Sequence, residues 1–187
     1  MEIVLVRHGQ TEWSLTGQHT SHTDIPLTDE GREQARNLGS QLAGRSFAIV
    51  LSSHYQRARE TAELAGFGDR LEIDDRLVEW DYGEYEGITT PEIRETRSDW
   101  WLWRDGCPGG EQPADVQARA DAVLERLRAL DGDAIVFAHG HFLRVLAARW
   151  IGEPAEFGSR LKLSAGSVSV LGFERDTEVL EQWNHVQ

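Results

Sequence analysis

The sequence predicts an α/β fold, a three-layer sandwich in which helices flank a mostly parallel central sheet. Apolar runs at residues 2–6, 47–53 and 133–138 have the length and composition of strands buried on both faces. Each run is followed along the chain by a helical pattern, and strands that alternate with helices pair in parallel. A length of 187 residues suits one domain over residues 1–187.

In the first half of the chain the predicted elements are, in order, a strand at 2–6, a polar loop at 10–27, a helix at 26–44, a strand at 47–53 and a helix at 55–66. Thr28 is a suitable N-cap for the first helix, and it places Asp29 and Glu30 in the first turn, where the helix dipole favours anions. Gly44 and Gly66 are positioned to end the two helices.

In the second half the predicted elements are a short strand from residue 70, an irregular stretch at 88–110 with at most short helices, a helix at 114–132, a strand at 133–138, a helix at 142–152 and two strands within 166–184. The helix at 114–132 carries Val116, Val123 and Leu127 on one apolar stripe. The last two strands alternate around a polar turn at 175–177, so we expect a hairpin that adds an antiparallel edge to the sheet.

Composition excludes several classes of function. The formal net charge of −13 makes nucleic acid and anionic membrane surfaces poor partners, because both require a basic face. No apolar run approaches the ~18 residues that span a bilayer, and the first residues do not resemble a signal peptide. The single cysteine, Cys107, fits a reducing compartment and lies in a predicted loop. We therefore expect a cytoplasmic protein.

Cationic and imidazole side chains follow the predicted core strands. The first strand ends in Arg7 and His8, the second is followed by Arg57 one turn into its helix, and the strand at 133–138 ends in His139. In folds of this class, ligands bind beyond the carboxyl ends of the strands. If these strands are neighbours, two histidines and two arginines meet at one edge of the sheet.

Phosphoryl transfer through histidine is the chemistry that requires this set. A neutral imidazole attacks phosphorus, and its unperturbed pKa of about 6.5 leaves it largely neutral at pH 7. Arginines supply fixed paired donors to the phosphoryl oxygens. Arg57 is a cation in the first turn of its helix, where it opposes the helix dipole. This placement predicts an anion between Arg57 and the N-terminus of the helix. Gly9 and Gly140 lack side chains and would let the backbone approach a phosphate.

The leaving group of a phosphate ester also needs a proton. Glu79 is our candidate acid, because its apolar neighbours Val78 and Trp80 favour the neutral form of a carboxyl group. We interpret Glu84 and Glu86 as solvated loop residues.

Four sequence blocks in this order resemble the histidine phosphatase superfamily, the phosphoglycerate mutase-like proteins: RHGQTEWS, SSHYQRARETA, LVEWDYGEYEG and FAHGH. The resemblance covers essentially the whole chain. It implies the phosphoglycerate mutase-like fold and a phosphohistidine mechanism, with no metal and no cofactor. His8 would be the nucleophile and Glu79 the acid–base residue, while Arg7, Arg57 and His139 would hold the phosphoryl group.

Within that superfamily the chain is most similar to sedoheptulose-1,7-bisphosphatase-like proteins and related acid phosphatases. That likeness and the strand-end glycine give a predicted set of substrate contacts: Ser14, His19, Thr20, Trp80, Asp81, Tyr82, Gly140 and Arg144. Many mutases have asparagine at the position of Ser14, and they carry a long insertion that this chain lacks. Both departures favour net hydrolysis over mutase-type phosphoryl transfer. The expected partner is a small phosphorylated metabolite such as a sugar phosphate.

Other interpretations of these residues remain open at this stage. The histidines could be structural, the arginines and Glu79 could form buried ion pairs, and a binding module for phosphorylated ligands would need no acid. A histidine metal site is disfavoured, because two arginines would repel the cation. We interpret His141 as a residue that supports its neighbours or caps the following helix, because His139 already has the phosphoryl-binding role. For Trp100, Trp101 and Trp103, the alternatives are core packing, a substrate lid or a homodimer contact.

Overall fold

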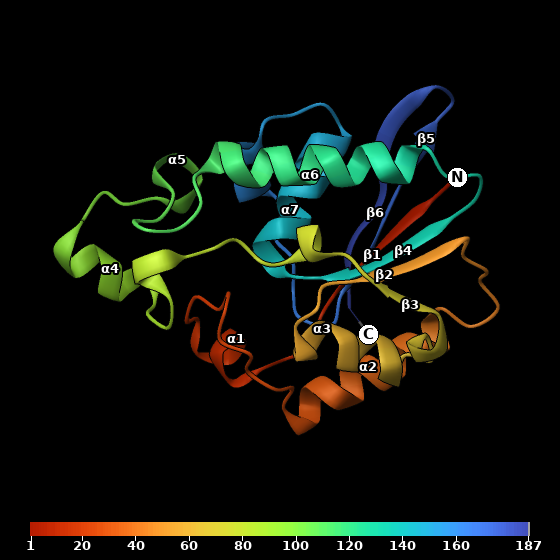
Figure 1. Cartoon of the computed structure of the whole chain (residues 1–187), viewed down its shortest axis with the longest axis horizontal. Coiled ribbons are helices and arrows are strands. Elements are labelled where there is room, and N and C mark those ends of the chain that lie inside the picture. The colour runs from red at the N-terminus through yellow and green to blue at the C-terminus, as the bar shows by residue number, and fades with distance from the viewer. Residues whose placement is uncertain (187) are drawn as a thin grey trace.

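The computed structural model describes residues 1–186, in which a six-stranded mixed sheet lies between two layers of helices (Figure 1). The strands are β1 (Ile3–Arg7), β2 (Ile49–Ser52), β3 (Leu71–Ile73), β4 (Ala134–Ala138), β5 (Val168–Glu174) and β6 (Thr177–His185). The α-helices are α1 (Glu12–Thr16), α2 (Asp29–Gln41), α3 (Gln56–Leu64), α4 (Thr90–Thr96), α5 (Leu102–Asp105), α6 (Pro113–Arg128) and α7 (Gly140–Trp150). Short 3₁₀ helices are η1 (Gly68–Arg70), η2 (Asp75–Leu77), η3 (Gly83–Tyr85) and η4 (Ala155–Arg160).

The strands follow the order β3-β2-β4-β1-β5-β6 across the sheet. β3, β2, β4 and β1 pair in parallel, whereas β5 is antiparallel to β1 and β6 is antiparallel to β5. The predicted mostly parallel sheet with an antiparallel hairpin at its edge is therefore confirmed. This order also makes β1, β4 and β2 direct neighbours, so that their carboxyl ends meet at one edge.

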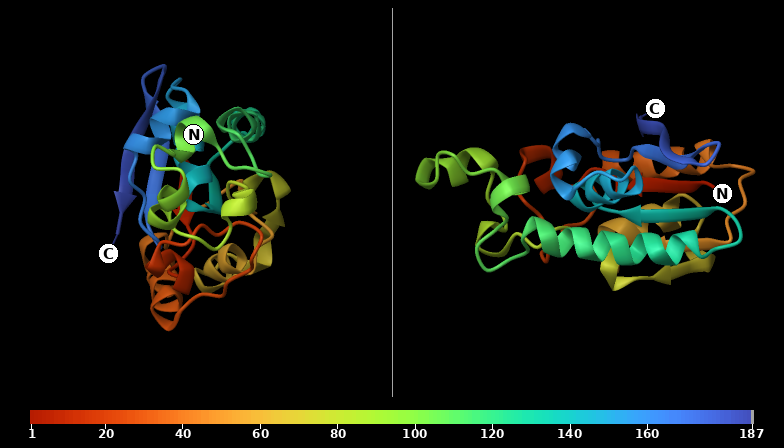
Figure 2. Two further views of the ribbon diagram at one scale, coloured as in Figure 1. Left: turned by 90° about the vertical axis from the view of Figure 1, so that its left-hand side faces the viewer. Right: turned by 90° about the horizontal axis from the view of Figure 1, so that it is seen from above.

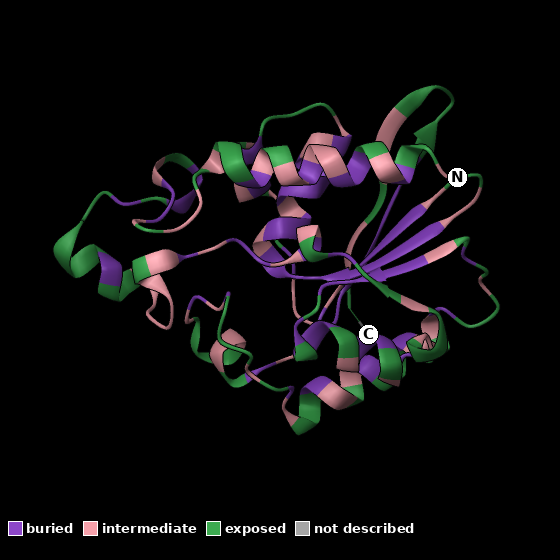
Figure 3. Ribbon diagram, viewed as in Figure 1, coloured by how far each residue is buried: buried purple, intermediate pink, exposed green. Residues whose placement is uncertain are grey.

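Helices cover both faces of the sheet (Figure 2), and alternate residues of each strand enter different cores. Ile3 and Leu5 of β1 belong to the core beneath α6 and α7, and Val4 and Val6 belong to the core beneath α2 and α3. Because both faces are covered, the central strands are continuous apolar runs, and Figure 3 shows them buried along most of their length. Among residues 1–186, no helix has both the length and the apolar composition needed to cross a membrane.

One predicted loop contains a helix. Residues 10–27 were expected to be irregular, but α1 forms within them, because Thr11 and Ser14 make a capping box. The Thr11 hydroxyl accepts from the Ser14 amide at 3.1 Å, and the Ser14 hydroxyl accepts from the Thr11 amide at 2.9 Å. α4 and α5 fall within the stretch at 88–110, where short helices were expected, and they project beyond the sheet (Figures 1 and 2).

Gly9 has a packing role that differs from the one expected. A Cβ atom at Gly9 would lie 2.3 Å from the carbonyl oxygen of Gly31 in α2, a distance that real side chains do not reach. Gly9 therefore allows the chain after β1 to pass closely over α2, and its amide donates to the Thr61 hydroxyl at 3.0 Å. The expectation that Gly9 faces a phosphate is replaced by this contact between backbones.

Candidate active site

The carboxyl ends of neighbouring strands bring the two predicted active-site histidines together. β1 pairs with β4 in a register that sets Arg7 opposite Ala138, so the next residues, His8 and His139, leave the sheet side by side. Their ring centroids lie 5.2 Å apart. The condition on which the sequence argument depended, that these strands are neighbours, is met.

A cavity of about 270 Å³ opens at this edge of the sheet. Of the predicted site residues, its wall contains Arg7, His8, Ser14, His19, Thr20, Glu79, Tyr82, Gly140 and Arg144. Arg57 and His139 are fully buried and lie outside the wall, and so do Trp80 and Asp81. The structure thus brings most of the predicted residues to one cavity and leaves one arginine, Arg57, and one histidine, His139, outside its wall.

The His8 ring has one nitrogen free to react. Its Nδ1 lies 2.8 Å from the carbonyl oxygen of Gly9, and because a carbonyl only accepts, Nδ1 carries the proton and the lone pair is on Nε2. Burial lowers the pKa of His8 well below its ordinary value of 6.5, and the charges of Arg57 and Arg7 lower it further. A neutral imidazole in the wall of a cavity has the form that a nucleophile needs.

Arg7 is a partly buried cation with an unused donor. Its Nη1 donates to the carbonyl oxygen of Leu163 at 2.6 Å, whereas its Nε is buried and has no partner within residues 1–186. Burial lowers the pKa of Arg7, and the charge of Glu79 opposes this shift. A Cβ atom at Gly140 would lie 3.2 Å from Arg7 Nε, so the glycine leaves room beside the guanidinium. An unpaired buried donor is rare in folded proteins, and a bound anion would satisfy it.

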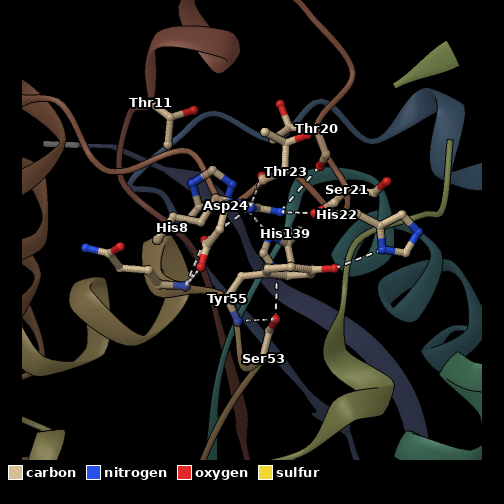
Figure 4. A network of polar contacts seen from close by, with 12 residues as sticks. His8, Thr11, Thr20, Ser21, His22, Thr23, Asp24, Ser53, Tyr55 and His139 are labelled. Atoms are coloured by element: carbon tan, nitrogen blue, oxygen red, sulfur yellow. Dashed lines mark hydrogen bonds and ion pairs between the residues drawn. The ribbon is translucent and has the colours of Figure 1, made fainter. Parts of the chain in front are cut away.

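The guanidinium of Arg57 is occupied by protein acceptors. Its Nε donates to His139 Nδ1 at 3.2 Å, Nη1 donates to the Thr23 carbonyl at 3.2 Å, and Nη2 donates to the carbonyls of Ser21 and Thr20 at 3.1 and 3.4 Å. Figure 4 shows these loop residues gathered around His139. Arg57 therefore influences the cavity through its charge, which lowers the pKa of His8.

An anion does lie between Arg57 and the N-terminus of α3, but it belongs to the protein. The carboxylate of Asp24 accepts from the backbone amide of Gln56 at 3.0 and 3.1 Å, and it lies 3.7 Å from Arg57 Nη1 (Figure 4). The expectation of a bound ligand at this point is therefore corrected. A loop carboxylate offsets both the helix dipole and the unfavourable position of the arginine.

Both ring nitrogens of His139 are used within the protein. Nδ1 accepts from Arg57 Nε, so Nε2 carries the proton and donates to the hydroxyl of Ser53 at 2.9 Å. Burial lowers the pKa of His139 well below 6.5, and the charge of Arg57 adds to the shift. In this geometry His139 contacts the ring of His8 and has no donor directed into the cavity, in contrast to the direct phosphoryl contact implied by the family resemblance.

Glu79 is held by the first turn of α7. Its Oε1 accepts from the amides of Trp80 and Phe142 at 2.9 and 2.8 Å, and its Oε2 accepts from the amide of His141 at 3.0 Å. The apolar neighbour Val78, on which the sequence argument rested, does not define these surroundings; backbone N–H groups do. The carboxyl group is thereby fixed in the cavity wall near His8.

Glu86 anchors the loop that surrounds Arg57. Its carboxylate accepts from the amide and the hydroxyl of Ser21, at 2.8 and 2.6 Å, and from the amide of Thr23 at 3.0 Å. The interpretation of Glu86 as a solvated residue was wrong, because its partners lie more than sixty residues earlier in the chain and no local pattern reveals them. Glu84, two residues earlier in the sequence, is exposed as expected.

Replacing Glu86 with alanine is expected to lower kcat/KM for phosphate release by about 10- to 100-fold, because small misplacements of charged groups near a reacting centre have effects of this size. The loop carbonyls of Ser21 and Thr23 would lose their anchor, and Arg57 would lose its fixed position. Steady-state kinetics with a phosphate monoester measures the effect. The matched control is Glu84→Ala, which should change the rate little, and an equal loss in both variants would contradict the assignment.

The cavity wall also contains a histidine that was not among the predicted site residues. His141 lines the cavity, and its Nδ1 lies 2.6 Å from the Tyr82 hydroxyl. The backbone amide of His141 also donates to Glu79 at the start of α7. The helix-capping interpretation therefore applies to the backbone of His141, whereas its side chain lines the cavity. Burial lowers the pKa of His141 well below 6.5 and raises the pKa of Tyr82 well above 10. His19 lies 4.6 Å from Tyr82 between ring centroids and donates Nδ1–H to the carbonyl of Ile88 at 2.7 Å.

Two predicted substrate contacts point elsewhere. The Trp80 indole is fully buried and donates Nε1–H to the carbonyl of Glu111 at 3.0 Å. The Asp81 carboxylate accepts from the amide of Gly83 at 2.9 Å and lies 3.1 Å from His22 Nε2. Both side chains shape the segment that carries Glu79 and Tyr82, and we leave them out of the proposed contacts.

The tryptophan segment 100–103 closes the other side of the cavity. Trp100 and Trp103 are buried, Trp101 is 40% exposed, and all three line the wall. Thr11, Trp13 and Arg94 also line it and were not predicted, since they lie on short helices or loops without a periodic pattern.

Three histidines with lowered pKa values predict a pH-dependent stability. The pKa values of His8, His139 and His141 are lowered in the folded state, so below pH 6.5 the unfolded chain binds protons that the folded chain does not. Above pH 6.5 this contribution to stability is fully present, and it is lost as the pH falls toward the lowered values. Each histidine contributes a slope of up to about 1.4 kcal/mol per pH unit. Denaturant unfolding at pH 7.5, 6.5 and 5.5 measures it, and a free energy of unfolding that is constant below pH 6.5 would contradict the prediction.

The described residues 1–186 contain no group of three or more histidine, cysteine, aspartate or glutamate side chains that could hold a metal ion. Cys107 is buried, and burial raises the pKa of its thiol to about 12, which disfavours the nucleophilic thiolate.

Comparison with known proteins is consistent with this site. An acid phosphatase of Mycobacterium tuberculosis is 44% identical over 193 residues, covering 99% of this chain and 94% of the relative. A sedoheptulose 1,7-bisphosphatase of Saccharomyces cerevisiae is 38% identical over 181 residues, covering 80% of this chain and 67% of that protein. A solved structure of an open reading frame of Mycobacterium tuberculosis has a TM-score of 0.94 at 40% identity, covering 99% of this chain and 97% of that one.

The mixed sheet flanked by helices is the phosphoglycerate mutase-like α/β fold, and the phosphatase relatives identify the chain as a phosphatase-type enzyme. The family description "Histidine phosphatase superfamily (branch 1)" matches residues 3–186. The chain belongs to the histidine phosphatase superfamily.

Proposed function

We propose that this phosphatase hydrolyses monoesters of small phosphorylated metabolites, chiefly sugar phosphates, through a phosphohistidine formed on His8. The observation that carries the proposal is the His8 ring, which is neutral, holds its proton on Nδ1 and lines the cavity together with Arg7 and Glu79. The acid phosphatase and sedoheptulose 1,7-bisphosphatase relatives support a phosphate ester as the substrate.

In the first step His8 Nε2 attacks phosphorus, and the bond between phosphorus and the ester oxygen breaks. The electron pair of that bond goes to the departing oxygen, which takes a proton from the acid form of Glu79. The Nδ1 proton of His8 remains on the ring, where the Gly9 carbonyl accepts it and stabilises the positive charge of the phosphorylated imidazole. The alcohol then leaves.

In the second step water attacks the phosphohistidine. Glu79, now a carboxylate, takes a proton from the water, and the electron pair of the nitrogen–phosphorus bond returns to His8 Nε2. Inorganic phosphate leaves, and both residues regain their starting forms. Arg7 supplies donors to the phosphoryl oxygens in both steps. Arg57, which donates to His139, lies outside the cavity wall, and its positive charge lowers the pKa of His8.

The cavity suits a polyhydroxylated substrate. Ser14, His19, Thr20 and Tyr82 line it with hydroxyl and imidazole groups, and such groups can exchange hydrogen bonds with sugar hydroxyls. We therefore propose these four residues and Arg144 as the substrate contacts. Trp101 belongs to the same wall, which favours the lid interpretation of the tryptophan segment over a homodimer contact.

Rapid quenching with a ³²P-labelled sugar phosphate tests the covalent step. We expect protein-bound label that survives alkali and is lost in acid, as is typical of a phosphorus–nitrogen bond. Release of inorganic phosphate without any such label in the wild-type protein would overturn the mechanism. Activity that persists in a strong chelator is expected, and transfer of phosphate to an acceptor without release of inorganic phosphate would favour the mutase alternative.

We also propose a cytoplasmic location, because the single cysteine, Cys107, is a free thiol and fits a reducing compartment. Cell fractionation with an antibody to the protein would test this assignment.

A further inference from the structure

The segment that carries Glu79 has no regular secondary structure to hold it. Residues 78–82 belong to neither a helix nor a strand, so their backbone groups take no part in a ladder of hydrogen bonds. Backbone carbonyls that are shielded from water need a donor from elsewhere in the protein. Three carbonyls of residues 76–79 find that donor in one side chain, Arg119 of α6.

Arg119 uses all five of its N–H groups. Its Nη1 donates to the carbonyls of Arg76 and Val78 at 2.8 and 3.0 Å, and its Nη2 donates to the carbonyl of Glu79 at 3.3 Å. The other donors, on Nε and Nη2, form a paired contact with the carboxylate of Glu111, each at 2.7 Å. Because a guanidinium offers five N–H groups in a fixed plane, every one of them is committed to this arrangement.

Glu111 holds the same segment two residues further along. Its Oε2 also accepts from the amide of Asp81 at 2.9 Å, and its own amide donates to the Asp81 carbonyl at 2.9 Å. Its carbonyl accepts from the indole of Trp80. The side chains of Arg119 and Glu111 are only 18% and 20% exposed, so water competes little for their ion pair. We call these two residues the Arg119–Glu111 clamp.

The clamp also contacts the first turn of α7. The guanidinium of Arg119 lies 4.8 Å from the centroid of the Phe142 ring, and the amide of Phe142 donates to the carboxylate of Glu79. The clamp therefore fixes the backbone of Glu79 relative to the same turn that binds its carboxyl group. Arg119 and Glu111 lie outside the cavity wall, so they can act on a substrate only through other residues.

We infer that the Arg119–Glu111 clamp positions the acid of the reaction, by holding Glu79 where its carboxyl group can give a proton to the departing ester oxygen. This inference rests on the proposed function, in which Glu79 is that acid. Proton transfer requires the two heavy atoms to come within about 2.6–3.2 Å, and an error of about 1 Å can lower a rate about 100-fold. The clamp thus controls the protonation of the leaving group without contact to the substrate.

Steady-state kinetics on Arg119→Lys tests the clamp. Lysine keeps the positive charge and can still pair with Glu111, but it has three donors on one nitrogen and no planar fork. The probes are benzyl phosphate, whose alcohol must be protonated as it leaves, and p-nitrophenyl phosphate, an ester of similar size whose nitrophenolate leaves without a proton. We expect kcat/KM to fall about ten-fold for benzyl phosphate and to stay within about two-fold of the wild-type value for p-nitrophenyl phosphate.

Arg128→Lys is the matched control. Arg128 lies on the same helix, pairs with Glu178 at 2.7 Å and has its guanidinium 5.1 Å from the centroid of the Trp150 ring. Its carboxylate partner belongs to β6 and not to the segment that carries Glu79. Both kcat/KM values should therefore stay near those of the wild-type protein, although a similar ion pair and a similar aromatic contact are altered.

Glu111→Gln removes the other half of the clamp and keeps the inference testable if Arg119→Lys does not fold. Glutamine has one acceptor oxygen, so it cannot bind both Arg119 and the amide of Asp81 as the carboxylate does. We expect the same selective loss with benzyl phosphate. Thermal unfolding of each variant, compared with the wild-type protein, identifies those that are folded.

A double variant shows whether the clamp acts through Glu79. In the Glu79→Gln background no acid is left to position, so adding Arg119→Lys should lower kcat/KM for benzyl phosphate by less than about two-fold. A further ten-fold loss in the double variant would mean that the two residues act independently, and it would overturn the inference.

The pattern across the two esters decides the result. Equal losses for both esters in a folded clamp variant, or no loss for either, would overturn the inference while phosphate release by the wild-type protein still upheld the proposed hydrolysis. A wild-type protein that is active only on p-nitrophenyl phosphate would overturn the acid role of Glu79 and the clamp with it. A wild-type protein that releases phosphate from neither ester would overturn the proposed function.

Discussion

Replacing His8 with alanine is expected to lower kcat for phosphate release by at least about 10⁴-fold, as loss of a covalent nucleophile does in other enzymes. Without the imidazole, water would have to attack the ester directly. Affinity for inorganic phosphate, measured by calorimetry, should largely remain, because Arg7 and Arg144 are retained. A non-catalytic binding module would show the same binding but no turnover in the wild-type protein.

The control for this variant is His185→Ala, which removes an exposed imidazole from β6. This change should leave kcat near the wild-type value. If the His8 variant hydrolysed a phosphate monoester at a similar rate, another group would be the nucleophile. The quench experiment would then locate the label, or show that water attacks the ester directly.

Replacing Glu79 with glutamine is expected to lower kcat/KM for an alkyl phosphate by about 10²- to 10⁴-fold, the usual contribution of a general acid. The loss for p-nitrophenyl phosphate should be far smaller, because nitrophenolate leaves without receiving a proton. The value of kcat/KM depends only on the steps up to the departure of the leaving group. The later role of Glu79 as a base therefore does not affect the comparison between the two substrates. Fructose 6-phosphate is a suitable alkyl substrate.

The comparison between the two substrates also separates chemistry from structure. Glu79 accepts N–H groups at the start of α7, and the amide of a glutamine cannot accept at both positions. Damage to α7 would lower the activity toward both substrates alike, in contrast to the loss of a proton donor. Equal losses would therefore contradict the acid role, and Glu84→Gln provides a variant of the same type at an exposed position.

The surroundings of Arg57 give the active site a layered organisation. The inner layer, Arg7, His8 and Glu79, lines the cavity, and the outer layer, Arg57 and His139, supports the His8 ring without reaching the wall. The outer layer depends on loop carbonyls that Glu86 and Asp24 hold in place. Electrostatic support from behind the nucleophile keeps the imidazole neutral, and the reacting nitrogen stays accessible.

The helices and strands could be predicted well because their sequence patterns are local. Buried runs such as 133–138 read as strands, and the stripe of the helix at 114–132 corresponds to α6 (Pro113–Arg128). The exception in the first loop, α1, is only five residues long, which is too short for a hydrophobic period to show. Its signal is the capping pair Thr11 and Ser14.

The sequence by itself determined the fold class and the chemical groups at the strand ends. Buried strands leave a strong apolar pattern, and the polar residues that follow them are confined to one edge once the strands pair in parallel. For that reason His8, Arg7 and His139 could be placed together before any contact was known.

Only the tertiary structure decided which atom each side chain binds. The acceptors of Arg57 come from a loop more than thirty residues earlier, and the acceptor of the Trp80 indole lies on Glu111, thirty-one residues later. Loops without periodicity leave such pairings unspecified in the sequence, because hydrogen bonds depend on the path of the chain in space. The division of the site into a cavity wall with Arg94 and Arg144 and a buried layer with Arg57 follows from that path.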